Sequence, residues 1–443
     1  MLTKEELLEK AKKPSQEAMK LHPFYQGKIE ITPKCCIRSM DDFSIWYSPG
    51  VAEPCKAINK NKDLSFDYTN RANLIAVISD GTRVLGLGNI GPEAAMPVME
   101  GKAMIFKYLG GVDAIPLCLD TTDPKKFIET VKLLEPSFGG INLEDIEMPK
   151  CFEILDTLRK EMNIPVWHDD QQGTALVTVA GFINALKVVG KKIDRVKIAM
   201  VGAGSANICT ARMLIKAGVN PENIIMTDTK GTLHKGRTEL QEKYKEKWEI
   251  CQKTNKNNVL GGIAEAMKGA DALVALSTPG PDIIKKEWIK AMAKDSIVFV
   301  CANPIPEIWP WEAKEAGARI VATGRSDFPN QVNNSLGFPG VFRGALDVRA
   351  KTITDEMCIA AANEIAKVQE DIGLDDEHIV PTMDNWEVYI REAVAVGLKA
   401  IEQGVARKIL TKEELRANAE KVIKRSRDEV KFLMEKGIIK MPE

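Results

Sequence analysis

Residues 196–207 read Val-Lys-Ile-Ala-Met-Val-Gly-Ala-Gly-Ser-Ala-Asn, and this stretch decides the fold. The apolar run over 196–201 is typical of a buried strand, and a helical pattern follows over 205–216. Gly202 permits the tight turn between them, and Gly204 lets the backbone approach a pyrophosphate held at the helix N-terminus. Because the glycines stand between a strand and a helix, we interpret them as a dinucleotide site and not as an ordinary turn.

The residues after this turn bear on the choice of dinucleotide. Asp228 follows the next predicted strand, where its carboxylate would bond a ribose hydroxyl and favour NAD. Lys230 would instead bind a 2′-phosphate and favour NADP, so the choice stays open. Asn207 stands at the third glycine position of the pattern, which predicts a slightly wider approach of helix to strand. The expected cofactor-binding set is Gly202, Gly204, Ser205, Ala206, Asn207, Asp228 and Lys230.

Strand and helix patterns alternate along most of the chain, which predicts an α/β fold. Further buried strands are expected at 72–79, 112–118, 164–167, 224–227, 271–276, 297–302 and 319–323, and helices at 4–20 with a break at Pro14, at 173–189 and at 412–435. We expect an N-terminal α/β substrate domain over 1–165 and a Rossmann-type, doubly wound parallel-sheet NAD(P)-binding domain over 166–335. C-terminal helices over 336–443 are expected to pack back on the first domain.

Composition restricts the class of partner. Lys plus Arg (61) balance Asp plus Glu (62) to a formal charge of −1, which argues against a nucleic-acid or anionic-membrane partner. No apolar run approaches the roughly 20 residues of a membrane helix, and the N-terminus lacks the apolar core of a signal peptide. Nine scattered cysteines without a Cys-x-x-Cys pair indicate reduced thiols in a cytoplasmic protein.

Two pairs of adjacent acids lie upstream of the dinucleotide turn. Glu144-Asp145 is flanked by apolar residues, and Asp169-Asp170 follows a predicted strand. Mg²⁺ and Mn²⁺ take oxygen ligands, so Glu144, Asp145 and Asp170 are candidates for a divalent-cation site near a hydride acceptor. Solvated acids at loop ends or helix caps are the alternative. His168 is expected to be structural, because carboxylates already dominate the site.

Seven segments resemble malic enzymes, especially the shorter prokaryotic-type chains, and they occur in the order of that family. They are Tyr47-Ser48-Pro49-Gly50-Val51, Leu85-Gly86-Leu87-Gly88-Asn89-Ile90-Gly91, Gly101-Lys102, Asn142-Leu143-Glu144-Asp145-Ile146, His168-Asp169-Asp170-Gln171-Gln172-Gly173-Thr174, Ala302-Asn303-Pro304 and Asn333-Asn334-Ser335-Leu336-Gly337-Phe338-Pro339-Gly340. The resemblance implies oxidative decarboxylation of (S)-malate to pyruvate and CO₂ with NAD or NADP and with Mg²⁺ or Mn²⁺. It also implies a homodimer or a larger even assembly.

The resemblance assigns catalytic roles to three residues. It makes Lys102 the general base and Tyr47 the general acid, and Asp169 is interpreted as an acid that orients Lys102 or the metal water. The metal ligands that it implies are Glu144, Asp145 and Asp170. A lysine works as a base when desolvation or a neighbouring cation brings its pKa near the working pH.

Substrate binding is assigned in the same way. Asn303 and Asn334 are expected to hold the substrate carboxylate, with Asn303 also on the nicotinamide side. Arg83 falls where larger family members carry a substrate-binding arginine, which many short members lack. The alternatives are a related oxidoreductase that converts malate to lactate without net redox change, an amino-acid dehydrogenase without the carboxylate metal site, and a non-catalytic dinucleotide-sensing protein.

Overall fold

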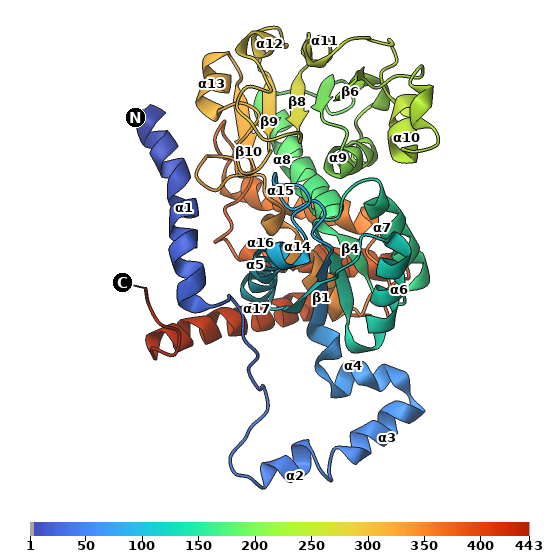
Figure 1. Ribbon diagram of the computed structural model, residues 1–443, viewed down its shortest axis with the longest axis vertical. Coiled ribbons are helices and arrows are strands. Elements are labelled where there is room, and N and C mark those ends of the chain that lie inside the picture. The colour runs from blue at the N-terminus through green and yellow to red at the C-terminus, as the bar shows by residue number, and fades with distance from the viewer. Residues whose placement is uncertain (1–3, 443) are drawn as a thin grey trace.

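The computed structural model, which describes residues 4–442, contains one parallel and one mostly parallel β-sheet, each covered by helices (Figure 1). The first three residues of the expected polar N-terminus lie outside the described residues. The predicted α/β class is confirmed, and most predicted strands are found within two residues of their expected bounds.

The first sheet has four parallel strands in the order β2-β1-β3-β4. These strands are β1 (Leu74–Ser79), β2 (Asp113–Cys118), β3 (Gly140–Leu143) and β4 (Val166–His168), and the intervening helices are α5 (Pro92–Gly110), α6 (Pro124–Leu134), the 3₁₀ turn η3 (Glu135–Ser137) and α7 (Lys150–Glu161). Because β4 pairs with β3, this sheet extends past the boundary at residue 165 expected from the sequence. The carboxyl ends of β1, β3 and β4 therefore meet at one edge.

The second sheet has six strands in the order β10-β9-β8-β5-β6-β7, and all but β7 are parallel. Its strands are β5 (Ile198–Val201), β6 (Ile224–Asp228), β7 (Gly231–Thr232), β8 (Ala272–Ala275), β9 (Ile297–Val300) and β10 (Ile320–Thr323). The helical segments between them are α9 (Ser205–Lys216), η5 (Pro221–Asn223), η6 (Thr238–Leu240), α10 (Lys245–Lys253), α11 (Ile263–Met267), α12 (Lys286–Lys290) and α13 (Pro310–Glu315). The central strands β5, β8 and β9 are fully buried apolar runs, as a parallel sheet covered on both faces requires.

The C-terminal helices return to the first sheet. They are η7 (Asn334–Leu336), α14 (Phe338–Asp347), α15 (Asp355–Ile372), α16 (Glu387–Glu402) and α17 (Lys412–Glu435), and α14 and α17 contact α5. Phe106 of α5 packs against Phe338 and Phe342 of α14 at ring-centroid distances of 4.5 and 5.1 Å. Thr411 caps α17 in a reciprocal capping box with Glu414, which explains why the start of this helix was predictable.

Helix α8 (Thr174–Val189) joins the two sheets through a π-helical turn, η4 (Asp169–Gly173). By length and composition alone, residues 169–189 qualify as a membrane span, so the expectation that no such run exists was wrong. The segment is 72% buried within the protein, where α8 packs against α9 and α15. It is therefore the core helix of a folded domain, and it ends at the predicted residue 189, with Gly190 in the left-handed conformation as its cap.

The N-terminal region forms a long helix and a projecting arm. Helix α1 (Lys4–Tyr25) continues through Pro14, so the predicted break is wrong; on an exposed helix, water can satisfy the backbone carbonyl that a proline leaves without a partner. Residues 28–64, here called the arm, contain α2 (Asp42–Trp46), α3 (Ala52–Lys60) and η1 (Lys62–Leu64). The segments α4 (Ser65–Tyr68) and η2 (Asn70–Asn73) connect the arm to β1, and Figure 1 shows α2 and α3 well away from both sheets.

Candidate active site

Lys102 lies buried at the centre of the first domain. It belongs to α5, is 8% exposed, and its Nζ lies 2.5 Å from Asp169 Oδ2, 3.0 Å from Glu144 Oε1 and 4.3 Å from the ring centre of Phe338. Burial alone would lower the pKa of Lys102, but the charges of Asp169 and Glu144 outweigh burial and raise it above its ordinary value. Lys102 is therefore held as an ammonium ion by these two acids.

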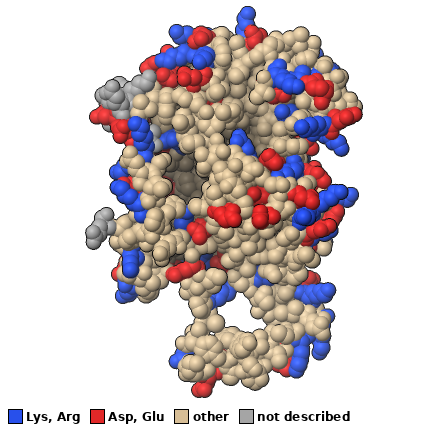
Figure 2. Space-filling model, viewed as in Figure 1, with Lys and Arg blue, Asp and Glu red and all other residues tan. Residues whose placement is uncertain are grey.

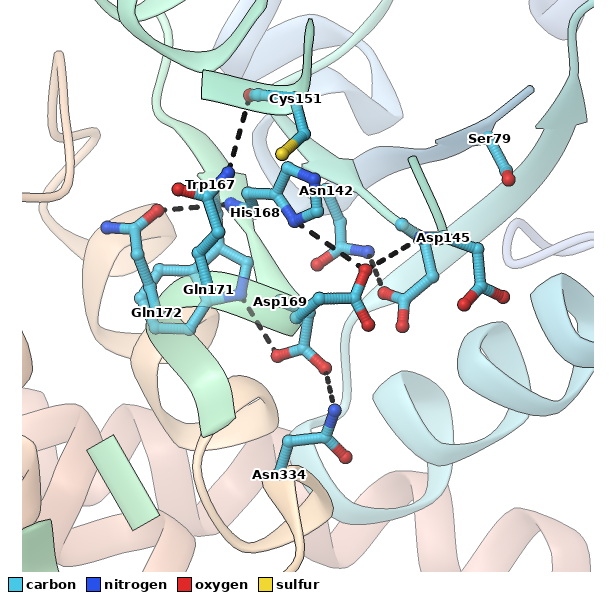
Figure 3. A network of polar contacts seen from close by, with 12 residues as sticks. Ser79, Asn142, Asp145, Cys151, Trp167, His168, Asp169, Gln171, Gln172 and Asn334 are labelled. Atoms are coloured by element: carbon cyan, nitrogen blue, oxygen red, sulfur yellow. Dashed lines mark hydrogen bonds and ion pairs between the residues drawn. The ribbon is translucent and has the colours of Figure 1, made fainter. Parts of the chain in front are cut away.

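Asp169 is fixed by several donors. Its Oδ1 accepts a hydrogen bond from Trp167 Nε1 at 3.1 Å, and its Oδ2 accepts from Lys102 and from Asn334 Nδ2, as Figure 3 shows for Trp167 and Asn334. A Cβ atom placed on Gly173 would lie only 2.0 Å from Asp169 Oδ1. The π-helical turn therefore needs glycine at position 173 to leave room for the Asp169 carboxylate.

Glu144, Asp145 and Asp170 form a second group of acids beside this one. One ligand oxygen from each lies within 4.8 Å of the others. Asp170 Oδ2 accepts from the Asp145 backbone N–H at 2.8 Å, while the buried Asp145 Oδ2 has no hydrogen-bond donor among the described residues. Burial, reinforced by the Asp170 charge, raises the pKa of Asp145 to about 8.

This group fits a hard divalent cation. Burial raises the pKa of Glu144 well above its ordinary value, and the neighbouring acids Asp169, Asp170 and Asp145 add to that rise against the opposing Lys102. Several buried carboxylates facing one another are unfavourable unless protons or a cation compensate their charge. Oxygen ligands at this spacing are the set that Mg²⁺ or Mn²⁺ uses.

His168 does not join the carboxylate group. It is fully buried, its Nδ1 lies 3.7 Å from Asp170 Oδ2, and burial lowers its pKa to about 4. Its ring is therefore neutral at ordinary pH, and it lies next to Asp170 but outside the group of three acids.

The proposed substrate residues lie on different loops. Asn334 reaches the Lys102 cluster through Asp169. Arg83 is exposed, and its backbone N–H donates to the Asp145 carbonyl at 2.9 Å. Asn303 lies on a loop of the second domain, close to the glycine-rich loop of the first, because a Cβ on Gly86 would come within 2.6 Å of the Asn303 carbonyl oxygen. The two domains thus face each other across these loops.

Tyr47 is not brought to Lys102 within this chain. It lies on the arm with 73% of its surface exposed. The arm carries several further large exposed apolar side chains, which are Ile29, Ile31, Ile37, Met40, Phe43, Ile45, Trp46 and Val51. The described part of one chain therefore contains the Lys102 cluster without the tyrosine.

The predicted dinucleotide turn lies between β5 and α9. Gly202 adopts φ 92°, and a Cβ there would lie 2.7 Å from the Leu276 carbonyl oxygen, so the position requires glycine. Asn207, expected to widen the approach and to belong to the cofactor-binding set, donates from Nδ2 to the carbonyl oxygens of Val201 and Gly202 at 2.9 and 2.8 Å. Asn207 thereby fixes the turn from inside, a role that the spacing of the glycines did not reveal.

Glu307 is a further residue that the sequence did not single out. Its buried carboxylate accepts from Ser277 N at 2.8 Å, from Ser277 Oγ at 3.1 Å and from Ala302 N at 3.1 Å. It thus joins the loops that follow β8 and β9, and burial raises its pKa to about 7. The only sign of this role in the sequence is that Glu307 is an acidic residue shortly after Asn303, in the loop that follows a predicted strand.

Comparison with known proteins agrees with this arrangement. Residues 26–159 match the family described as malic enzyme, N-terminal domain, and residues 171–401 match malic enzyme, NAD binding domain. The chain belongs to the malic enzyme family. The resemblance found in the sequence is therefore confirmed, and the second match shows that the predicted glycine turn lies within a NAD-binding domain.

Individual relatives of this malic enzyme chain cover most of its length. It is 49% identical to the bifunctional malic/malolactic enzyme of Bacillus subtilis (strain 168), over 92% of this chain and 98% of that protein. It is 50% identical to the NAD-dependent malic enzyme of Geobacillus stearothermophilus, over 86% of this chain and 78% of that protein. The crystal structure of Entamoeba histolytica malic enzyme matches with a TM-score of 0.97 at 48% identity, over 100% of this chain and 93% of that one.

Proposed function

We propose that this chain catalyses the oxidative decarboxylation of (S)-malate to pyruvate and CO₂, with reduction of NAD or NADP and with a divalent cation. The observation that carries the proposal is the buried contact of Lys102 with Asp169 and Glu144, immediately beside the acids Glu144, Asp145 and Asp170. A nicotinamide-binding domain faces this cluster across the loops of Gly86 and Asn303. Removing a hydride from an alcohol carbon needs both a proton acceptor and an electron acceptor, and these are the two halves of the site.

Lys102 is proposed to move the proton of the substrate C2 hydroxyl. Asp169 acts on it as a positioning residue, because Asp169 touches Lys102 and is itself held by Trp167 and Asn334. Asn334 Nδ2 and the Arg83 guanidinium are proposed to bind substrate carboxylates, since each offers a donor at the edge of the cluster. Asn303 is proposed to orient the substrate or the nicotinamide from the facing loop.

Glu144, Asp145 and Asp170 are proposed to hold Mg²⁺ or Mn²⁺. When bound, the cation would polarise the substrate oxygen as a Lewis acid and compensate the acid charge that keeps the pKa of Lys102 high. The unpartnered Asp145 Oδ2 supports this proposal, since a buried carboxylate oxygen without a donor is unusual. Asp170→Asn should weaken Mn²⁺ binding about tenfold or more in a calorimetric titration, whereas the exposed Asp120→Asn should leave it unchanged.

Tyr47 is proposed to act in the site of a second copy of the chain. A phenol near Lys102 would protonate C3 of the enolate left by decarboxylation, and Lys102 could then return a proton to it. The arm carries several exposed apolar side chains and stands apart as the lower lobe of Figure 2, where the charged side chains in view lie along its edges. Exposed apolar patches of this kind mark protein interfaces, so we propose a homodimer in which each arm completes the partner's site.

The proposed location is the cytoplasm. All nine cysteines are free in the structure, and five of them are buried as small apolar side chains: Cys151, Cys209, Cys251, Cys301 and Cys358. Free thiols are typical of proteins in a reducing compartment. The proposed partners are malate and pyruvate, and the balanced charge gives no reason to propose nucleic acid or a membrane.

One assay tests the reaction. Purified protein is incubated with (S)-malate, NAD or NADP, and either Mn²⁺ or EDTA, and reduced dinucleotide, pyruvate and lactate are measured. We expect equal amounts of pyruvate and reduced dinucleotide with Mn²⁺ and neither with EDTA. Lactate without net dinucleotide reduction would favour the malolactic alternative, and no turnover of malate under any condition would overturn the proposal.

A further inference from the structure

Glu307 is a buried carboxylate to which the proposed reaction assigns no role. It lies in the loop between β9 and α13, and its exposed fraction is 0%. The donors that approach it are a hydroxyl and backbone N–H groups rather than a cation. Burying a charged group costs free energy that hydrogen bonds must compensate, so the partners of Glu307 show what its burial secures.

Each oxygen of Glu307 holds one loop of the NAD-binding domain. Oε1 accepts from Ser277 N at 2.8 Å and from Ser277 Oγ at 3.1 Å, in the loop after β8. Oε2 accepts from Ala302 N at 3.1 Å, in the loop after β9. The Glu307 backbone carbonyl also accepts from Ile284 N at 3.0 Å, which anchors the residue itself. Hydrogen bonds to a charged acceptor are stronger than those between neutral groups, so Glu307 fixes the two loops relative to each other.

The same two loops meet the first domain at Gly86. A Cβ atom on Gly86 would lie 2.4 Å from Pro279 Cγ and 2.6 Å from the Asn303 carbonyl oxygen. Pro279 belongs to the loop after β8 and Asn303 to the loop after β9, so both contacts come from segments that Glu307 holds. A shift of either loop would therefore change how the two domains face each other.

The glycine-rich loop around Gly86 is joined in turn to the acids of the first domain. Arg83 N donates to the Asp145 carbonyl at 2.9 Å, and Leu85 N donates to Asp145 Oδ1 at 3.4 Å. Continuous contacts therefore run from Glu307 through the two loops and Gly86 to Asp145.

We propose that Glu307 is a positioning residue for the reaction, which holds Asn303 and Pro279 against Gly86 and so sets how the NAD-binding domain faces the acids of the first domain. Its carboxylate acts through the two loops and not on the reacting atoms. Hydride transfer requires the reacting atoms in contact, and a displacement of about 1 Å can lower the rate up to about a hundredfold. This inference rests on the proposed function only for the role of Asn303 in orienting the substrate or the nicotinamide.

Only the ionised form of Glu307 can hold both loops. Its two oxygens face the backbone N–H groups of Ser277 and Ala302, so each oxygen must accept. A proton on the carboxyl, or the amide of a glutamine, turns one acceptor into a donor that opposes an N–H group. Burial raises the pKa of Glu307 to about 7, against the hydrogen bonds from Ser277 and Ala302. Burial and the Glu307 charge also raise the pKa of the neighbouring Cys301 thiol, which therefore stays uncharged near neutral pH.

Kinetics at two pH values test this role. Glu307→Gln is compared with Glu392→Gln, a control that replaces another fully buried glutamate, on α16, by glutamine. At pH 8, where wild-type Glu307 is mostly ionised, Glu307→Gln should lower kcat about tenfold and change the malate KM less than about threefold. At pH 6, where the wild-type carboxyl is mostly protonated, the difference in kcat should shrink to about twofold. Glu392→Gln should stay within about twofold of wild type at both pH values.

Hydrogen–deuterium exchange tests the contact between the domains without malate, dinucleotide or metal. At pH 8, Glu307→Gln should speed exchange in residues 276–281 and 300–306, which Glu307 holds directly, and also in residues 85–89 of the first domain. Faster exchange in the first two segments alone would make Glu307 a local structural residue and overturn the proposal.

Ser277→Ala gives an independent reading if Glu307→Gln folds poorly. It removes one hydrogen bond that lowers the pKa of Glu307, so the acid limb of the kcat profile should move to higher pH. An unmoved limb, or a Glu307→Gln enzyme that loses the same factor in kcat at pH 6 and pH 8, contradicts the proposal. If malate is not oxidised, the proposed function fails while exchange in residues 85–89 still tests this inference. If malate is oxidised but exchange in residues 85–89 is unchanged by Glu307→Gln, only this inference fails.

Discussion

The Lys102 cluster and the arm carry two parts of one proposed reaction, yet a single chain builds them to very different degrees. Lys102 is buried between Asp169 and Glu144, and Asp169 is held in turn by Trp167 and Asn334. Tyr47 lies on a projecting segment whose apolar side chains are exposed. Fixing charged groups precisely requires a packed domain, whereas the arm gains packing only when another surface covers it. The contrast predicts that one part is assembled on folding and the other on association.

The largest loss of activity is expected from a substitution in the buried Lys102 cluster. Lys102→Ala should lower kcat by about 10²- to 10⁴-fold, because no other described cationic side chain lies between Asp169 and Glu144. Lys107→Ala, five residues along the same helix and partly exposed, is the matched control and should stay within about threefold. Malate oxidation by Lys102→Ala at close to the wild-type rate would show that proton transfer occurs elsewhere.

Substitution of the exposed Tyr47 should lower the activity without changing the oligomeric state. Tyr47→Phe removes only the hydroxyl, so we expect kcat to fall about 10²-fold while the oligomer seen by light scattering is unchanged. Tyr68→Phe, an exposed tyrosine nearby outside the arm, should keep wild-type activity. An unaffected Tyr47→Phe enzyme would make the tyrosine part of the interface only.

The rigidity of the Lys102 cluster can be tested through a glycine. Gly173→Ala would bring a methyl group to 2.0 Å from Asp169 Oδ1, so Asp169 must move away from Lys102, and we expect kcat to fall by roughly 10- to 100-fold. Gly101→Ala adds the same methyl group on α5, where nothing lies within 4 Å, and serves as the control. Equal activity of the two variants would mean that the cluster tolerates displacement.

The smallest effect concerns the stability of the packed body. Glu392 is fully buried, neither of its carboxylate oxygens has a hydrogen-bond partner among the described residues, and burial raises its pKa well above the ordinary value. The folded state therefore keeps Glu392 protonated while the unfolded state ionises it, so stability is full below the unfolded pKa and falls as the pH rises toward the folded one. Glu392→Gln should raise the melting temperature at pH 8 by roughly 2–4 °C and leave it nearly unchanged at pH 4. A gain that is independent of pH would contradict this origin.

Local patterns explain what the sequence could predict. The glycine turn at Gly202, the strands of both sheets and the capped helix α17 depend on residues close together in the chain. The acids Glu144, Asp145 and Asp170 follow strand ends, and parallel strands bring their carboxyl ends to one edge of the sheet. The sequence could therefore predict that these three acids lie close together.

Other features depend on contacts that no local pattern encodes. The room that Gly173 leaves for Asp169, and the two loops that Glu307 joins, are created by tertiary packing. The apolar composition of α8 does not distinguish a core helix from a membrane helix until its neighbours are known. The exposure of Tyr47 follows from the way the arm projects from the packed domains, which no local pattern encodes.

Complementation between two inactive variants tests the central claim most directly. Lys102→Ala and Tyr47→Phe protomers, each expected to keep about 1% of wild-type activity or less when alone, are unfolded, mixed in equal amounts and refolded together. If the arm of one copy completes the site of the other, each mixed dimer contains one intact site, and activity should recover to about a quarter of the wild-type value. A mixture that forms dimers but stays as inactive as the separate variants would contradict the account, because Tyr47 and Lys102 would then have to come from the same chain.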